Sequence, residues 1–177
     1  TIPATVPTRT GYVFMGWGTA VDSTTVSYNP GDTYSINASI SLFAVWGYRV
    51  TWDAATNGGT VSPSYTDVVA GQAIATAPTP TRLGYTLNTW GQTFPYTPTA
   101  AITLTATYTA NTYTATFKYQ DSVTADTTKT VTYNAQYGTL PTPTRTGYSF
   151  NGWFDASTGG TQITSTTVFV GLSNPTL

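Results

Sequence analysis

The chain repeats one eleven-residue phrase three times, and this repeat constrains the fold more than any other feature. The phrase reads PTRTGYVFMGW at residues 7–17, PTRLGYTLNTW at 80–90 and PTRTGYSFNGW at 143–153. Its shared glycine recurs after 73 and then 63 residues, by subtraction of the positions 11, 84 and 147. Because solenoid repeats are about 20–50 residues long, we expect each of these longer repeats to be a small domain.

Strand and turn patterns divide the chain into one partial repeat and two further repeats. Residues 1–47 hold a first repeat that lacks an opening strand pair, and residues 48–110 hold a complete second repeat. Residues 111–177 hold a third repeat, whose closing strand is truncated at Leu177 when it is compared with the first. We therefore expect a segment of a longer array; the alternative is that a neighbouring copy completes the first repeat by strand addition.

Apolar residues alternate with small or hydroxyl residues over short stretches, and this period of two predicts strands. No window shows the 3.6-residue apolar period of a long helix, so the fold class expected is mainly β with little helix. Only residues 22–28 and 165–172 leave room for a turn of helix. The strands expected from the pattern span residues 40–46, 48–52, 61–69, 102–108, 113–119 and 130–133.

Composition excludes several classes of function. Charged residues are 7% of the chain, the net charge is −1 and the few basic residues are scattered, so no surface would bind nucleic acid. The absence of His and Cys removes Ser-His-Asp and Cys-His catalysis, disulfides and nearly all zinc sites. No apolar run is long enough to cross a membrane. We expect no enzymatic activity, no cofactor, no metal site and no membrane insertion.

The side chains of the phrase are expected to hold each unit together. Tyr and Phe lie two residues apart on one strand face, and a bulge at the second glycine would return Trp to that face. The arginine is expected to stack on an aromatic ring and to cap loop carbonyls. The predicted structural residues are Arg9, Gly11, Tyr12, Phe14, Gly16, Trp17, Arg82, Gly84, Tyr85, Trp90, Arg145, Gly147, Tyr148, Phe150, Gly152 and Trp153.

Three binding interpretations compete with this structural one. The aromatic residues could form sugar-stacking platforms, the arginines an exposed clamp, and the threonines near residues 103–116 a flat array for ice or glycan. Burial, ring stacking and the solvent face of a twisted sheet explain the same residues without a ligand. We favour the structural interpretation in each case.

The phrase PTRTGYxFxGW, with a variable loop and a closing LxAxW strand, resembles the Listeria–Bacteroides repeat, the B-repeat of internalin-type bacterial surface proteins. The resemblance spans essentially the whole chain. It implies compact β-grasp-like (ubiquitin- or SUMO-like) units without catalytic residues, used in tandem as a stalk. The second copy departs from the phrase at Leu87 and Thr89, and the third has a longer polar loop in its opening hairpin.

These observations together predict a spacer or stalk segment of an exported, adhesin-like bacterial cell-surface protein. Its expected partners are neighbouring repeats of the same chain. One alternative is a module that binds a host surface protein or glycan through the variable loops at 22–32 and 155–163. Another alternative is self-association into a surface filament.

Overall fold

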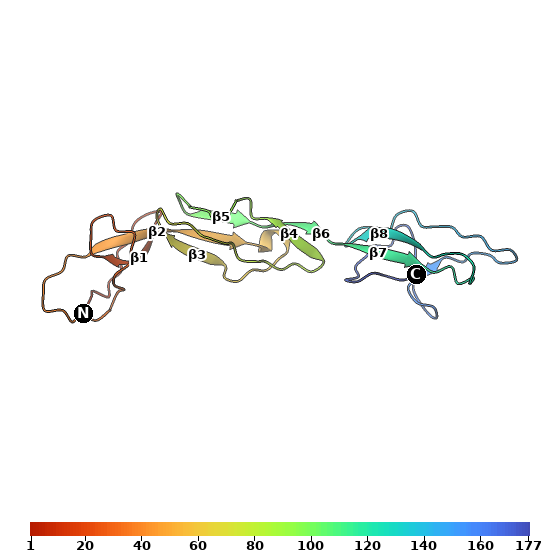
Figure 1. Cartoon of the computed structure of the whole chain (residues 1–177), viewed down its shortest axis with the longest axis horizontal. Helices are drawn as coiled ribbons and strands as arrows, with labels where there is room; N and C mark the ends of the chain where they lie inside the picture. The colour runs from red at the N-terminus through yellow and green to blue at the C-terminus, as the bar shows by residue number, and fades with distance from the viewer. The chain divides into compact units, whose positions relative to one another are not determined.

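The structure is a computed structural model that describes residues 1–177 and is built almost entirely of strands (Figure 1). The only helical element is a three-residue 3-10 helix, Ala55–Asn57. The mainly β class is therefore confirmed, and residues 22–28 and 165–172 form no helix. The ten strands are β1 Val13–Gly18, β2 Phe43–Asp53, β3 Tyr65–Val69, β4 Tyr85–Thr89, β5 Ile102–Thr105, β6 Thr107–Ala110, β7 Thr112–Phe117, β8 Thr127–Thr132, β9 Trp153–Phe154 and β10 Gln162–Ile163.

The eleven-residue strand β2 organises the first sheet. Along one edge it pairs antiparallel with β1 and then parallel with β5, and along the other edge it pairs antiparallel with β3. Gly47 lies where β1 and β3 overlap, opposite Val13 on one side and Val69 on the other. The sheet is thus assembled around one shared strand (Figure 1).

The expectation of separate strands at residues 40–46 and 48–52 is wrong, because residues 43–46 and 48–52 belong to the single strand β2, and residues 40–42 lie in no strand. In the sequence, Gly47 suggests a break between two strands. In the structure, its missing side chain allows β3 to approach β2 closely. A Cβ atom at this position would lie 2.3 Å from the carbonyl oxygen of Val68. The glycine therefore continues the strand instead of ending it.

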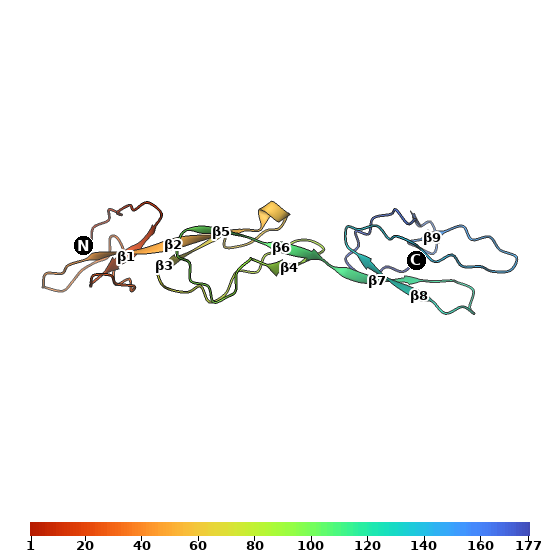
Figure 2. The same ribbon diagram turned by 90° about the horizontal axis from the view of Figure 1, so that it is seen from above.

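A second sheet begins with the antiparallel hairpin β7–β8 (Figure 2). Thr116 in β7 also forms a parallel bridge with Thr176. Its amide donates to Pro175 at 2.9 Å, and its carbonyl accepts from the amide of Leu177 at 2.8 Å. This hairpin with a parallel closing segment repeats the arrangement of β2, β3 and β5.

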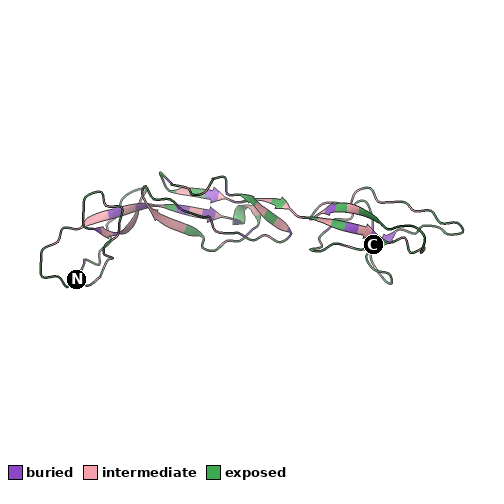
Figure 3. Ribbon diagram, in the orientation of Figure 1, coloured by how far each residue is buried: buried purple, intermediate pink, exposed green.

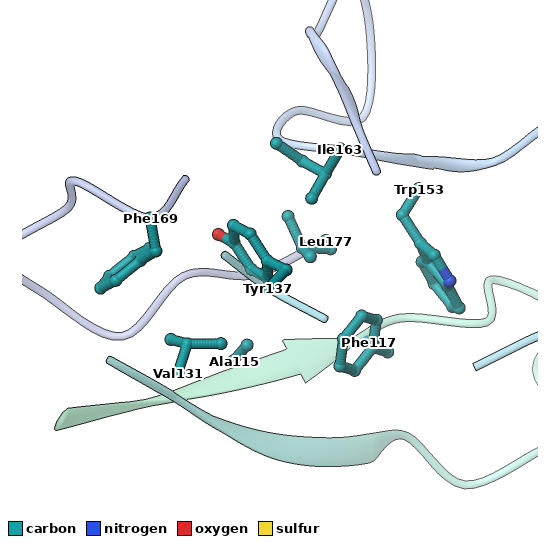
Figure 4. Packing of buried hydrophobic residues seen from close by; sticks show 8 residues of the cluster. All are labelled: Ala115, Phe117, Val131, Tyr137, Trp153, Ile163, Phe169 and Leu177. Carbon is teal, nitrogen blue, oxygen red and sulfur yellow. The ribbon is translucent and has the colours of Figure 1, made fainter. Parts of the chain in front are cut away.

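Contacts divide the chain into two compact units, residues 1–81 with 87–107 and residues 82–86 with 108–177. Each unit has its own core, in which buried positions alternate with partly buried or exposed positions along the strands (Figure 3). Val50, Trp52, Trp90 and Leu104 are buried in the first. The core of the second consists of Ala115, Phe117, Val131, Tyr137, Trp153, Ile163, Phe169 and Leu177 (Figure 4).

The β-grasp plan itself stays a prediction. The β2 sheet has a hairpin and a parallel closing strand, and the β7–β8 sheet has a hairpin and a parallel bridge at Thr176. No helix packs across either sheet, because the single helical element has three residues.

Candidate functional site: the aromatic clusters of the repeated phrase

Trp90 and Trp153 are core residues, each 4% exposed. Each meets the opening strand of its repeat in a T-shaped contact, Trp90 with Trp52 at 5.2 Å and Trp153 with Phe117 at 4.9 Å between ring centroids. Such aromatic pairs add to the stabilisation from area burial. Rings buried in this way cannot stack on a sugar in solvent.

Both indole N–H groups find the same backbone partner. Trp90 Nε1 donates to the carbonyl of Pro78 at 3.0 Å, and Trp153 Nε1 donates to that of Pro141 at 2.8 Å. Each proline lies twelve residues before its tryptophan. The Pro-Thr-Pro lead-in of the phrase is therefore held against the core by a bond that satisfies a buried donor.

Trp17 differs from the other two tryptophans. It is half-buried and packs on Phe14 at 5.1 Å, and its Nε1 atom is buried without a hydrogen-bond partner. No strand equivalent to the second half of β2 precedes it in the chain. The first copy therefore has the phrase without the ring that covers it elsewhere.

A bulge brings Trp17 to the face of Phe14. The register of β1 on β2 shifts between Phe14 and Gly16, and Gly16 has a φ of 142°. A Cβ atom on Gly16 would lie 2.4 Å from Cγ1 of Val26, so a side chain cannot be accommodated without movement. The second copy has Thr89 at this position, where its hydroxyl accepts from the amide of Gly91 at 2.9 Å.

The Arg-x-Gly-Tyr segment is a tight turn in every copy. The glycine at its third position has a φ of 80°, 75° and 79° at Gly11, Gly84 and Gly147 respectively. A positive φ at this position defines a type II turn, which favours glycine. The tyrosine amide donates to the arginine carbonyl at 3.1, 3.1 and 3.0 Å in chain order.

The turn places each guanidinium over the ring of its tyrosine. The distances from Cζ to the ring centroid are 3.9 Å for Arg9 on Tyr12, 3.7 Å for Arg82 on Tyr85 and 4.1 Å for Arg145 on Tyr148. In the first two copies an aromatic residue of the closing strand lies next to the same guanidinium, Trp46 at 5.9 Å and Tyr108 at 5.4 Å. The third copy has no such ring, and Tyr148 is 67% exposed.

The expected capping of loop carbonyls by these arginines is not found. Arg9, Arg82 and Arg145 have cation–π contacts, while the hydrogen-bonded arginine is Arg49, which forms a bidentate pair with Asp67 at 2.8 and 2.7 Å. Each guanidinium lies over the face of its tyrosine ring, where cation–π attraction stabilises the contact. The arginines thus act through stacking in this structure.

Asp121 and Asp53 accept hydrogen bonds from nearby loop residues, and the acidic residues do not gather into a reactive group. Hydrogen bonds from the Thr124 hydroxyl and from the amides of Thr124 and Val123 lower the pKa of Asp121 to about 2. Hydrogen bonds from Thr56 similarly lower the pKa of Asp53. No group of three His, Cys, Asp or Glu side chains comes together to hold a metal ion.

The features above define a class of protein: a tandem array of small β units whose repeated phrase supplies a turn, a stacked Arg–Tyr pair and a core tryptophan. The family model of the Listeria–Bacteroides repeat domain matches residues 1–45, 48–112 and 113–177. The chain belongs to this family, a non-catalytic repeat type that is typical of bacterial surface proteins. No curated protein and no solved structure matches the chain. The structure contains no helix with the length and hydropathy that a membrane span requires.

Proposed function

We propose that this chain is a spacer segment of an adhesin-like bacterial cell-surface protein, and that its repeats hold other parts of that protein at a distance. The observation that carries the proposal is the continuity of β2 from the first repeat into the second. A linker would allow the two repeats to swing, whereas a shared strand with partners on both edges resists bending. The Trp46–Gly47–Tyr48 junction lies inside that strand.

The junction after the second repeat is also held by backbone hydrogen bonds on both sides. Asn111 lies between β6 and β7, its amide donates to the carbonyl of Gly84 and its carbonyl accepts from the amide of Tyr133, both at 2.9 Å. In the first junction, Gly47 is paired with Val13 of β1 on one edge and with Val69 of β3 on the other. The contacts of Asn111 lie within one compact unit, residues 82–86 with 108–177, and hold the start of the third repeat in place there.

Distance measurements between spin labels test this proposal. The chain has no cysteine, so Ala20→Cys with Gln92→Cys labels two exposed positions of the same compact unit, one in the first repeat and one in the second. We expect a single narrow distance distribution. Insertion of Gly-Ser-Gly-Ser after Gly47 should broaden it, and an unmodified chain as broad as the insertion variant would contradict the spacer role.

Binding and assembly assays decide between the spacer and the two other functions. Saturable sub-micromolar binding of a host surface protein or a glycan, abolished by changes in residues 22–32 or 155–163, would identify a binding module. A mass in solution that rises with concentration would identify a self-assembling subunit. A spacer should give neither result.

A further inference from the structure

The second phrase is divided between the two compact units of the chain. Residues 82–86, which carry its Arg-x-Gly-Tyr turn, belong to the unit of residues 108–177, while residues 87–90 belong to the other unit. Trp90, at the end of the phrase, is buried in the core of the second repeat, where its ring packs on Trp52. The two ends of one phrase therefore have different surroundings, and the turn at its start lies with the repeat that follows.

The following repeat contributes the ring of Tyr133 to this turn. Tyr85 and Tyr133 meet in a T-shaped contact with 5.5 Å between ring centroids. A Cβ atom on Gly84 would lie 2.4 Å from the Tyr133 ring, so the bare glycine backbone is part of the contact surface. Gly84 is buried, whereas the equivalent Gly11 is exposed and has no neighbouring atom within 4 Å of its Cβ position. The ring of Tyr133 thus packs on the turn itself.

Asn111 connects the two sides of this contact. Its amide donates to the carbonyl of Gly84, and its carbonyl accepts from the amide of Tyr133, both at 2.9 Å. Its side-chain oxygen accepts from the hydroxyl of Thr86 at 2.6 Å. These bonds hold the backbone of the turn beside the residue that follows β8, so the two tyrosine rings are brought together by bonded backbone on both sides.

A different tyrosine meets the phrase turn at the first junction. Tyr48 lies two residues after Trp46 in β2, and its ring centroid is 5.0 Å from that of Tyr12. The rings of Tyr12 and Trp46 both lie near the guanidinium of Arg9, at 3.9 and 5.9 Å. In both phrases, the tyrosine is therefore covered by its own arginine and contacted by a tyrosine of the following repeat.

The length of each junction explains why two different tyrosines meet the turn. Along a strand, two residues span about 7 Å and return to the same face, whereas five span about 16 Å and reach the opposite face. Trp46 and Tyr48 are two residues apart, but Tyr108 and Tyr113 are five apart. Tyr113 packs instead on Phe169 in its own repeat, at 5.4 Å between ring centroids. The ring at the second turn therefore has to come from another strand, and the residue after β8 supplies it.

We propose that the Arg-x-Gly-Tyr turn of the first two phrases is a docking surface for the following repeat, with Tyr48 and Tyr133 as the respective partners. Stacking by the phrase arginine holds the phrase tyrosine in place for this contact. The proposal is independent of the spacer role, because it concerns which residues join one repeat to the next. The distance test between Ala20 and Gln92 probes the other compact unit, so the two proposals can fail separately.

Hydrogen exchange on the full chain tests the docking at the second phrase, because the two ends of this phrase lie in different units. Tyr85→Thr should accelerate exchange at residues 112–117 and 127–132 about tenfold, equivalent to about 1.4 kcal/mol, and leave residues 48–53 unchanged. Trp90→Phe, in the same phrase, should accelerate exchange at 48–53 and leave 112–117 unchanged. If Tyr85→Thr accelerates exchange at 48–53 and not at 112–117, the turn folds only its own repeat and the proposal is overturned.

A double-mutant cycle tests the contact between the two tyrosines. Tyr133→Thr should accelerate exchange at 112–117 as much as Tyr85→Thr does, and the double variant should also be about tenfold faster than the original chain. Two independent losses would multiply to about a hundredfold in the double variant. The same cycle with Tyr12→Thr and Tyr48→Thr, measured at residues 13–18, tests the first junction. Losses that multiply at either pair overturn its assignment as a docking contact.

Discussion

Trp153 connects the sequence phrase to the stability of its unit. Its ring is 4% exposed and contacts Phe117, Phe150 and Tyr119 at centroid distances of 4.9, 5.3 and 5.6 Å. Trp153→Ala should lower the free energy of unfolding of residues 108–177 by about 3–5 kcal/mol, as for other large-to-small core changes. Urea denaturation followed by hydrogen exchange measures the loss in each unit.

The matched control is Trp153→Phe, which keeps a ring but removes the hydrogen bond to Pro141. The carbonyl of Pro141 would lose its indole donor, so the free energy of unfolding should fall by about 1–2 kcal/mol. This loss is well below that expected for the alanine variant. Equal losses for the two variants would mean that the hydrogen bond, and not packing, accounts for the role of the residue.

Two glycines at one phrase position separate backbone strain from crowding. Gly84 and Gly147 have nearly the same φ, 75° and 79°, but only Gly84 is crowded, because a Cβ atom there would lie 2.4 Å from the ring of Tyr133. Gly147→Ala should cost about 1 kcal/mol for the positive φ alone. Gly84→Ala should cost about 2–3 kcal/mol, since the ring must also move. Thermal unfolding of the two variants tests this difference, and equal melting temperatures would contradict it.

At the scale of the element, local patterns were a good guide to which residues form strands and a poor guide to where strands join. Alternation predicted the strand regions at 40–46 and 48–52, but no local signal shows that Gly47 has strands on both sides. The need for a glycine in a bulge was visible at Gly16, whereas Thr89 at the same phrase position has no positive φ, and its hydroxyl accepts from the amide of Gly91. The unsatisfied Nε1 atom of Trp17 could not be predicted either, because in the other copies this atom bonds the carbonyl twelve residues earlier. Long-range pairing decides each of these points.

Asp121 accepts hydrogen bonds from Val123 and Thr124 in the loop between β7 and β8. The pKa of Asp121 therefore reports whether these bonds are formed. The pKa in the folded state, about 2, lies below the ordinary value of 3.8 because Thr124 and nearby amides donate to the carboxylate. The contribution to stability is therefore present above about pH 3.8 and is lost as the pH falls through about 2. Thr124→Val should raise the pKa of Asp121 toward its ordinary value.

An NMR titration of the Asp121 carboxyl carbon measures this shift. Asp53 is the internal control, because its lowered pKa is due chiefly to Thr56 and should not respond to a change at Thr124. A pKa of Asp121 that stays near 2 in the variant would show that the backbone amides alone are sufficient.

At the scale of the molecule, the first and second repeats are not expected to unfold independently, because they share strand β2. In an array with near-additive stability, each repeat contacts only its neighbours. Here the first and second repeats have one strand in common, while residues 108–177 have a separate core. Cooperative unfolding should therefore follow the shared strand and not the boundaries of the sequence repeat.

Val50→Ala tests this coupling. Val50 is fully buried in the second half of β2, between Thr66 and Ile102, and its truncation should cost about 2 kcal/mol. Because β1 pairs with the first half of the same strand, hydrogen exchange should accelerate at residues 13–18 as well as at 65–69, and residues 112–117 should be unaffected. Val21→Ala, at a residue 66% exposed in the first repeat, should change neither region. Faster exchange at 65–69 alone would show that the first repeat keeps its strand pair when the second opens, and that the continuity of β2 does not couple them.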